Sequence, residues 1–149
     1  MSSMLYAKLW QPGAEAVARC RRSLAYLPWG RMPIHDAPAA DCVCGIYGAR
    51  APQFARSLLT APAGGTVAYR VLGQVALCGR VVEAELGWRS AFGYPSNLYV
   101  PTRSQGARLG WRRRRLSPTE VASALQVYDV PVSITDFSAS KREIVKQTP

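Results

Sequence analysis

The only histidine of the chain and three of its four cysteines fall within 25 residues of a 149-residue sequence. They are Cys20, His35, Cys42 and Cys44, with the spacing C-x14-H-x6-C-x-C. Thiolate sulfur and imidazole nitrogen are ligands that zinc prefers, and four of them complete a tetrahedron. The pattern therefore predicts a structural Cys3His zinc site that pins the N-terminal third of the chain to the rest of the fold.

Three other interpretations of these residues stay open. A strand over residues 42–48 would place Cys42, Cys44 and Ile46 on one face, as an ordinary buried stripe. A disulfide is less favoured because cysteines at i and i+2 of one strand are poorly placed for each other, and nothing marks the chain as secreted. A thiolate nucleophile beside His35 would make a thiol-dependent enzyme, but no partner that would orient the imidazole stands out.

Basic residues outnumber acidic ones by 19 to 9, which gives a formal net charge of +10, and sixteen of the basic residues are arginine. Arginine binds phosphate through paired hydrogen bonds and stacks on bases, although a GC-rich genome also enriches it. The charge balance predicts a polyanionic partner, most simply a nucleic acid, without distinguishing DNA from RNA. A basic protein with no such partner is the alternative.

A run of four arginines is the first candidate for nucleic-acid contact: Arg112, Arg113, Arg114 and Arg115. The run precedes a helix start marked by a capping box, with Ser117 as the N-cap and Glu120 three residues later. Arginines beside the positive end of a helix dipole are unfavourable unless an anion binds there. The sequence therefore predicts a phosphate contact at this point, with a solvated basic loop as the alternative.

An aromatic-rich stretch over residues 87–101 holds the second set of candidates, Trp88, Arg89 and Tyr94. Such side chains can form a stacking platform for an unpaired base. Packing in the core is the commoner role of large rings, and it is the favoured interpretation of each aromatic taken singly.

The hydrophobic pattern predicts an α+β fold. Strands are expected over residues 1–10, 42–48, 67–86, 98–100 and 132–137, and helices over 14–24 and 52–59 and from Ser117 onward. Gly73 and Gly79 lie within the longest strand tract, where glycines mark bulges or sharp bends. The expected architecture is a small, bent, mostly antiparallel sheet or partial barrel with two or three packed helices.

Length and terminal composition predict the domain organisation. Residues 1–137 are expected to form a single globular domain, followed by a flexible C-terminal tail over residues 138–149. No apolar run approaches the length of a membrane span, and the N-terminus lacks the pattern of a secretory signal. These features predict a cytoplasmic protein with no membrane association, which agrees with free or metal-bound thiols.

Two segments, C-V-C-G-I-Y-G and V-A-L-C-G-R-V-V-E-A-E-L-G-W-R-S-A-F-G-Y-P, together with the residues between them, span residues 42–95 in the middle of the chain. They resemble a group of small uncharacterised proteins of high-GC bacteria with the pattern C-x-C-G-I-Y-A … W-G-x-V-x-E-x-E-x-G-x-R-A. The resemblance implies that His35, Cys42 and Cys44 belong together, and it implies no activity. Cys78 stands where that group has tryptophan, which supports leaving it out of the metal set. The bent strands are also similar to the small barrels of PUA-like RNA and DNA readers, in fold alone.

The features above predict a non-enzymatic nucleic-acid-binding or regulatory module with zinc as a structural clip. One alternative is a protein-interaction adaptor of a phage or mobile element that acts on a DNA-bound partner. The other alternative is a thiol-dependent enzyme. The sequence contains no Walker motif, dinucleotide-binding glycine loop, metalloprotease histidine pair or nucleophile elbow.

Overall fold

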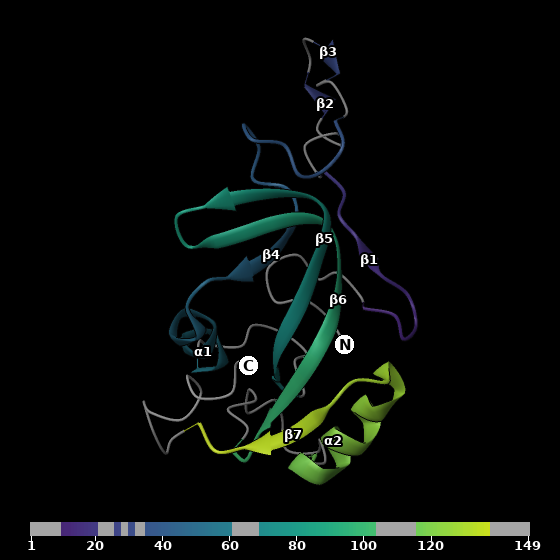
Figure 1. The fold of residues 1–149 in the computed structure, drawn as a ribbon, viewed down its shortest axis with the longest axis vertical. Helices are drawn as coiled ribbons and strands as arrows, with labels where there is room; N and C mark the ends of the chain where they lie inside the picture. Colours follow the sequence, from purple (N-terminus) through teal and green to yellow (C-terminus); the bar gives the residue numbers. More distant parts are fainter. Residues whose placement is uncertain are drawn as a thin grey trace.

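A long antiparallel hairpin runs through the computed structural model of the protein (Figure 1). Its strands are β5 (Leu72–Ala84) and β6 (Gly87–Pro101). The structure describes residues 10–20, 26–27, 30–31, 35–60, 69–103 and 116–137. Within these residues, no helix is long and apolar enough to cross a membrane.

Strand β6 is the strand on which the sheet is assembled. One edge of β6 pairs with β5, and the other edge pairs with three short strands in turn: β4 (Ile46–Ala49) opposite residues 87–90, β1 (Ala16–Val17) opposite 92–93, and β7 (Val132–Thr135) opposite 98–101. Ser90 shows both edges in use, because it lies opposite Ile46 of β4 and Val81 of β5. The β7 pairing is parallel and the others are antiparallel, so the described strands form a small, mostly antiparallel open sheet.

The hairpin bends sharply where β5 contains a glycine with positive φ. Gly79 has φ +73°, and the register of β5 against β6 shifts between Cys78 and Val81. A second shift, between Gln74 and Val75, lies next to Gly73. Figure 1 shows the hairpin turning away from its original direction in this part of the sheet. The prediction that these glycines mark irregular points of the strand is confirmed.

Two α-helices accompany the sheet. Helix α1 (Pro52–Thr60) confirms the predicted helix over residues 52–59. Its C-terminal turn leaves carbonyl groups without helical donors, and the guanidinium of Arg70 donates to two of them, Leu58 O at 2.9 Å and Leu59 O at 3.3 Å. Arg70 thereby ties α1 to the chain just before β5.

Helix α2 (Pro118–Leu125) begins where the capping box predicts, and the short 3-10 helix η2 (Gln126–Tyr128) continues it. The Ser117 hydroxyl accepts from the Glu120 N–H at 3.2 Å, and the Glu120 carboxylate accepts from the Ser117 N–H at 2.8 Å. Two backbone donors of the first turn are satisfied in this way.

Replacing this N-cap with alanine should weaken α2 measurably. We expect Ser117→Ala to lower the free energy of unfolding by about 1 kcal/mol, because one helix-end donor loses its acceptor. Urea denaturation of Ser117→Ala beside Ser123→Ala, which alters a serine inside the same helix, checks this. Equal stability of the two variants would contradict the capping role.

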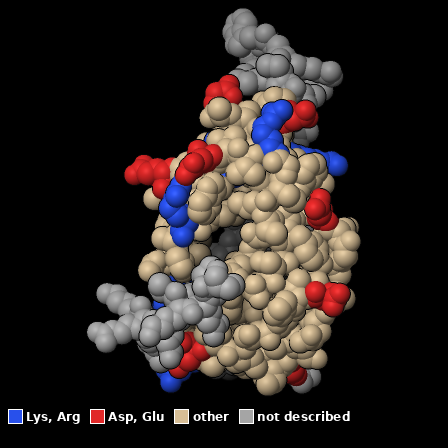
Figure 2. Space-filling view, in the orientation of Figure 1, with Lys and Arg blue, Asp and Glu red and all other residues tan. Residues whose placement is uncertain are grey.

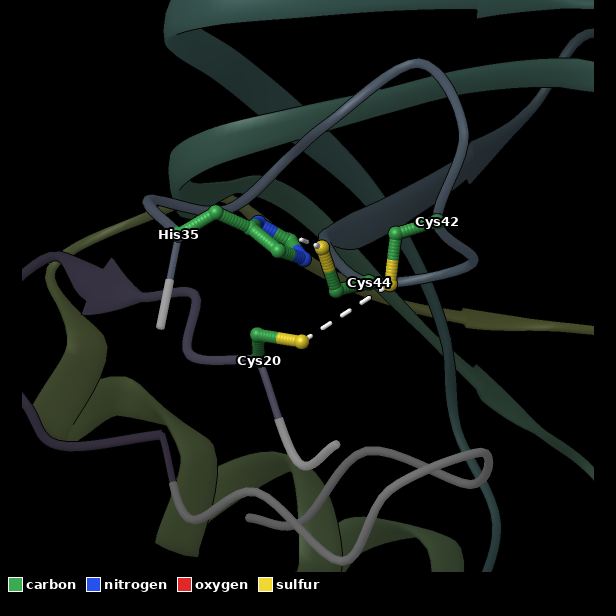
Figure 3. A group of neighbouring side chains, drawn as sticks. All are labelled: Cys20, His35, Cys42 and Cys44. Carbon is green, nitrogen blue, oxygen red and sulfur yellow. Dashed lines mark hydrogen bonds between the residues drawn. The ribbon is translucent and has the colours of Figure 1, made fainter. Parts of the chain in front are cut away.

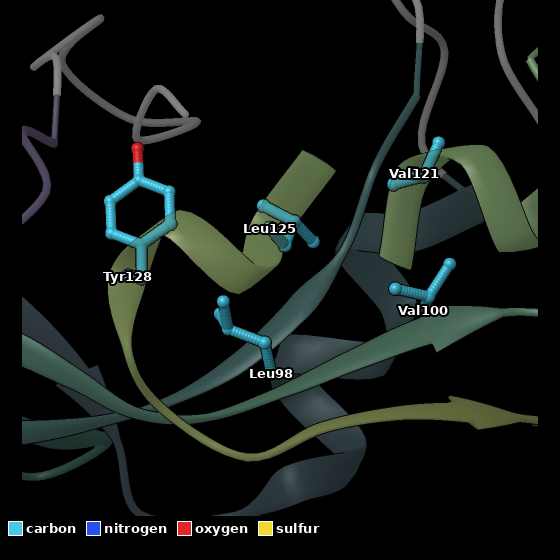
Figure 4. Close-up of a cluster of buried hydrophobic side chains, with 5 residues drawn as sticks. All are labelled: Leu98, Val100, Val121, Leu125 and Tyr128. Carbon is cyan, nitrogen blue, oxygen red and sulfur yellow. The ribbon is translucent and has the colours of Figure 1, made fainter. Parts of the chain in front are cut away.

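The main core lies between β6 and the α2–η2 unit (Figure 4). Its buried members are Leu98, Val100, Val121, Leu125 and Tyr128. The first two come from β6, and the other three come from α2 and η2 at the helical spacing i, i+4 and i+7, so burial of this face fixes α2 on the sheet.

The predicted helix over residues 14–24 is wrong for the residues that the structure describes. Residues 14–20 contain strand β1, and the alternation of Ala16, 3% exposed, with Val17, 43% exposed, is that of a strand. Pairing with β6 outweighs the helical spacing of Val17 and Cys20.

Two predicted strands are only partly comparable with the structure. Strand β4 covers only the end of the predicted tract over residues 42–48. The predicted strand over residues 1–10 lies, except for Trp10, outside the described residues. A separate two-stranded ladder joins β2 (Tyr26–Leu27) and β3 (Gly30–Arg31).

Candidate metal centre

Two strand pairings deliver the cysteines to one place beside β6. The pairing of β1 with β6 continues through an Ala18 N–H to Ala91 O hydrogen bond of 2.8 Å, which carries the chain to Cys20. Cys44 lies two residues before β4, whose Ile46 lies opposite Ser90 of β6. The loop between His35 and Cys44 is tightened by a Cys42 N–H to Ala39 O hydrogen bond of 3.2 Å. Residues far apart in the sequence therefore converge because β6 is their common neighbour.

The ligand atoms of Cys20, His35, Cys42 and Cys44 all lie within 4.8 Å of one another (Figure 3). The sulfurs of Cys20 and Cys42 are 3.7 Å apart, and the Cys44 sulfur is 4.0 Å from Nδ1 of His35. All three cysteines are free thiols, and a separation of 3.7 Å is far longer than the disulfide bond of about 2.05 Å. Three sulfurs and one imidazole facing a shared point could hold a metal ion.

The surroundings of the four residues are closed but almost without large apolar groups. Cys20, Cys42 and Cys44 are buried together with Ala37, and Ala18 and Ala39 pack against them. Among the residues that the structure describes, this Cys/Ala cluster is separate from the main core and contains no leucine, valine or aromatic side chain. Small side chains bury little area, and Pro38 is the one larger apolar side chain that the loop over residues 35–44 buries, so the hydrophobic effect makes a limited contribution to holding this loop in place.

The electrostatics of the cluster favour ionisation of one thiol. The backbone N–H of Cys44 lowers the pKa of Cys42 to about 7, since it stabilises the thiolate, and hydrogen bonds with His35 and Cys20 act in the same direction. Burial raises the pKa of Cys44, because desolvation disfavours its charged form. The pKa of His35 is raised, chiefly by the carbonyl of Asp36.

The imidazole of His35 has one nitrogen near a backbone acceptor. Nδ1 lies 3.1 Å from the carbonyl oxygen of Asp36. A proton on Nδ1 leaves the lone pair on Nε2, and metal-bound histidines commonly have this arrangement, with the second nitrogen donating to a carbonyl.

Arg89 is the residue of this centre that sequence reasoning did not assign to it. It lies on β6, is 9% exposed, and its guanidinium donates to the carbonyl groups of Ala39, Cys42 and Cys44, at 3.3 Å and 3.2 Å for the first and last. The contacts span 45 to 50 positions of sequence, so no local pattern announces them. The sequence placed Arg89 with Trp88 and Tyr94 as a candidate base contact.

The other two residues of that set have separate surroundings. Trp88 is covered by the guanidinium of Arg50, 4.5 Å from its ring centroid. Tyr94 packs against the main core, where its hydroxyl donates to the carbonyl of Tyr128 and accepts from the Gly13 N–H, both at 2.9 Å. The contacts of Tyr94 are those of a packing residue, whereas Trp88 is half-buried beside the exposed side chain of Arg50. The arginine run over residues 112–115 lies outside the described residues.

Cys78 takes no part in the metal centre, as the sequence predicts. It lies on β5, and its thiol donates to the carboxylate of Glu15 at 3.5 Å. It therefore offers a matched control for experiments on the other three thiols.

Charge is distributed unevenly along the sequence. Eight basic and eight acidic residues belong to the described ranges, and Figure 2 shows both signs interspersed on one face. The described ranges thus sum to zero, and the other eleven basic residues and one acidic residue carry the whole net charge of +10. Residues 104–115 alone contain five arginines and no acidic residue.

Gly45 allows the close approach to β6 of the loop that contains His35, Cys42 and Cys44. Its φ is +131°, and a Cβ at this position would lie 2.9 Å from Cβ of Arg89 and 3.3 Å from Cβ of Pro38. We expect Gly45→Ala to lower the free energy of unfolding by about 1–3 kcal/mol, because backbone strain and overlap add. Gly13→Ala is the control, since Gly13 also has positive φ but no atom within 4 Å. An equal loss in both variants, measured by thermal unfolding, would contradict the close approach.

Comparison of the chain with protein-family models, with curated proteins and with solved structures gives no significant match. The function is therefore inferred from the site and the charge distribution.

Proposed function

We propose that the protein is a non-enzymatic nucleic-acid-binding module whose N-terminal segment is fastened to the sheet by a structural zinc ion. The convergence of the four ligand atoms within 4.8 Å carries the metal part of the proposal. The uneven distribution of charge carries the nucleic-acid part.

Zinc is the metal that the ligand set favours. Zinc–sulfur bonds of about 2.3 Å in a tetrahedron place two sulfurs about 3.8 Å apart, close to the 3.7 Å between Cys20 and Cys42. Three thiolates and one imidazole make a closed four-ligand set, which is typical of structural rather than catalytic zinc. The Cys/Ala cluster is too small to hold the loop by burial, and metal binding would supply the missing stabilisation.

Metal affinity should fall as the pH drops below about 7. Zinc binds thiolate and neutral imidazole, and the pKa of Cys42 is about 7, so this thiol takes up a competing proton as the pH falls through that value. The raised pKa of His35 acts in the same direction. We expect about tenfold weaker binding per pH unit for each ligand that becomes protonated, measured by competition with a chromophoric chelator. Affinity that stays constant down to about pH 5 would argue against thiolate and imidazole ligation.

A polyanionic partner would explain the concentration of positive charge in residues 104–115, which contain five arginines and no acidic residue. Arg112, Arg113, Arg114 and Arg115 immediately precede Leu116 and the N-cap Ser117, so the run joins the folded scaffold at the start of α2. Arginine side chains and a helix N-terminus both favour phosphate. The proposed role of the scaffold is to anchor this segment.

The salt dependence of binding tests this role. Replacing the four arginines of residues 112–115 with glutamine should make the fall of log K with log salt on duplex DNA less steep by about 3–4, because each phosphate contact contributes about 0.9 to this slope. Arg80→Gln with Arg103→Gln removes two exposed charges elsewhere and should change the slope much less. A wild-type affinity for DNA and RNA that is insensitive to salt, or an unchanged slope in the run variant, would overturn the nucleic-acid proposal and favour a protein partner.

A thiol-dependent enzyme is a second candidate because the pKa of Cys42 is lowered to about 7 beside an imidazole. The two functions predict different effects of a chelator on the alkylation rate of the thiols. Alkylation of a structural zinc thiolate should be slow until a chelator removes the metal, whereas a catalytic thiolate would react rapidly at neutral pH with or without the chelator.

A further inference from the structure

The positive charge of Arg89 is buried, and the described residues supply no carboxylate that balances it. The ion pair among the described residues joins Arg50 and Glu83 at the exposed surface, and no described carboxylate pairs with Arg89. Three carbonyl oxygens lie within hydrogen-bond reach of its Nη1, but they supply only partial negative charge. A buried cation without an opposite charge is costly, so a negative group is expected nearby.

The loaded metal centre would be that negative group. A divalent ion with three thiolates and one neutral imidazole carries a net charge of −1. The guanidinium of Arg89 bonds to the backbone of two of the ligand residues, Cys42 and Cys44, so its charge lies beside the centre. At the short separations and low polarity of a buried site, opposite charges attract strongly.

We propose that Arg89 is a positioning residue of the metal centre, which neutralises the net negative charge of the loaded Cys3His site and holds the loop over residues 39–44 against β6. The proposal rests on the zinc clip inferred above. It explains two observations together: a buried arginine without a carboxylate, and its donation to the carbonyls of ligand residues. The loaded centre and Arg89 together carry no net charge, and a fourth thiolate in place of His35 would leave −1.

The test separates charge from hydrogen bonding. Arg89→Gln removes the charge and keeps a donor, and Arg89→Lys keeps the charge with a different donor geometry. We expect Arg89→Gln to bind zinc about 10–100-fold more weakly than wild type, the usual effect of losing an outer-shell partner, and Arg89→Lys to recover most of that loss. Equal affinity of the glutamine variant and wild type, or equal losses in both variants, would overturn the counter-charge role.

A change of ligand charge provides the second measurement. Cys20→His would make the loaded centre neutral, and Cys20 is not among the residues to which Arg89 donates. In this background Arg89→Gln should cost clearly less affinity than in the wild-type background, since there is no net charge to balance. The same cost in both backgrounds would contradict the proposal.

Thermal unfolding gives a second readout of the Arg89 role, which can still be used if a variant folds poorly. Arg89→Gln should lower the melting temperature of the zinc-loaded protein more than that of the chelated protein, whereas a purely structural role predicts equal shifts. Failure of the wild-type protein to bind zinc or cobalt at all would instead disprove the zinc clip, which distinguishes that outcome from failure of the Arg89 role alone.

Discussion

Removal of zinc is expected to release residues 10–20 and 35–45 from the sheet while the main core stays folded. The proposed metal ligands come from both segments, and the Cys/Ala cluster between them contains no large apolar side chain among the described residues. Hydrogen exchange with and without a chelator measures the effect. At free zinc of about 100 times the dissociation constant, the metal contributes about 2.7 kcal/mol, so protection of residues 35–45 should fall about 100-fold.

The control for this prediction lies within the same protein. Peptides from β5, β6 and α2 should keep most of their protection in chelator, because Leu98, Val121 and Leu125 pack without any metal ligand. Cys78→Ser should behave as wild type, since Cys78 is outside the metal centre. Uniform loss of protection, or no loss at residues 35–45, would show that the metal does not act as a local clip.

Truncation of Leu98 should cause the largest loss of stability among core substitutions. Leu98 is 1% exposed and lies at the centre of the packing between β6 and the α2–η2 unit. We expect Leu98→Ala to lower the free energy of unfolding by about 2–5 kcal/mol, through lost transfer energy and the cavity left behind. Urea denaturation at equal zinc saturation measures it.

Val127 offers the matched surface position for this substitution. It belongs to η2 but is 59% exposed, so Val127→Ala should change stability by about 0.5 kcal/mol or less. Similar losses for the two variants would mean that the α2–η2 unit does not form the main core with β6.

These two predictions test different parts of one sheet. Strand β6 contributes Leu98 and Val100 to the main core near one end, and Arg89 to the metal centre near the other. The first region is stabilised by buried apolar area, and the second is proposed to depend on the metal. Chelation and Leu98→Ala should therefore affect stability almost independently.

The features that sequence reasoning predicted well are local ones. The capping box of Ser117 and Glu120 specifies the start of α2 within a few residues, because its hydrogen bonds join near neighbours. The four residues that could hold a metal were recognisable in the sequence because thiols and imidazole are rare side chains with restricted chemistry, and four of them fall close together.

The features that it missed depend on contacts across the chain. Residues 14–20 have helical spacing, and only pairing of Ala16 with Gly93 of β6 makes this segment a strand. Arg89 resembles any other arginine in the sequence, and its role follows from carbonyl groups about 50 positions away. Such contacts can be recognised only once strand β6 is known to pair with both β1 and β4.

The metal content of the protein, purified without a histidine tag, tests the central claim most directly. Elemental analysis should find one zinc ion per chain in the wild-type protein and in Cys78→Ser, and none or nearly none in Cys42→Ser. A folded wild-type protein with four reactive thiols and no bound metal would contradict the zinc clip, and Cys20, Cys42 and Cys44 would then be ordinary buried thiols.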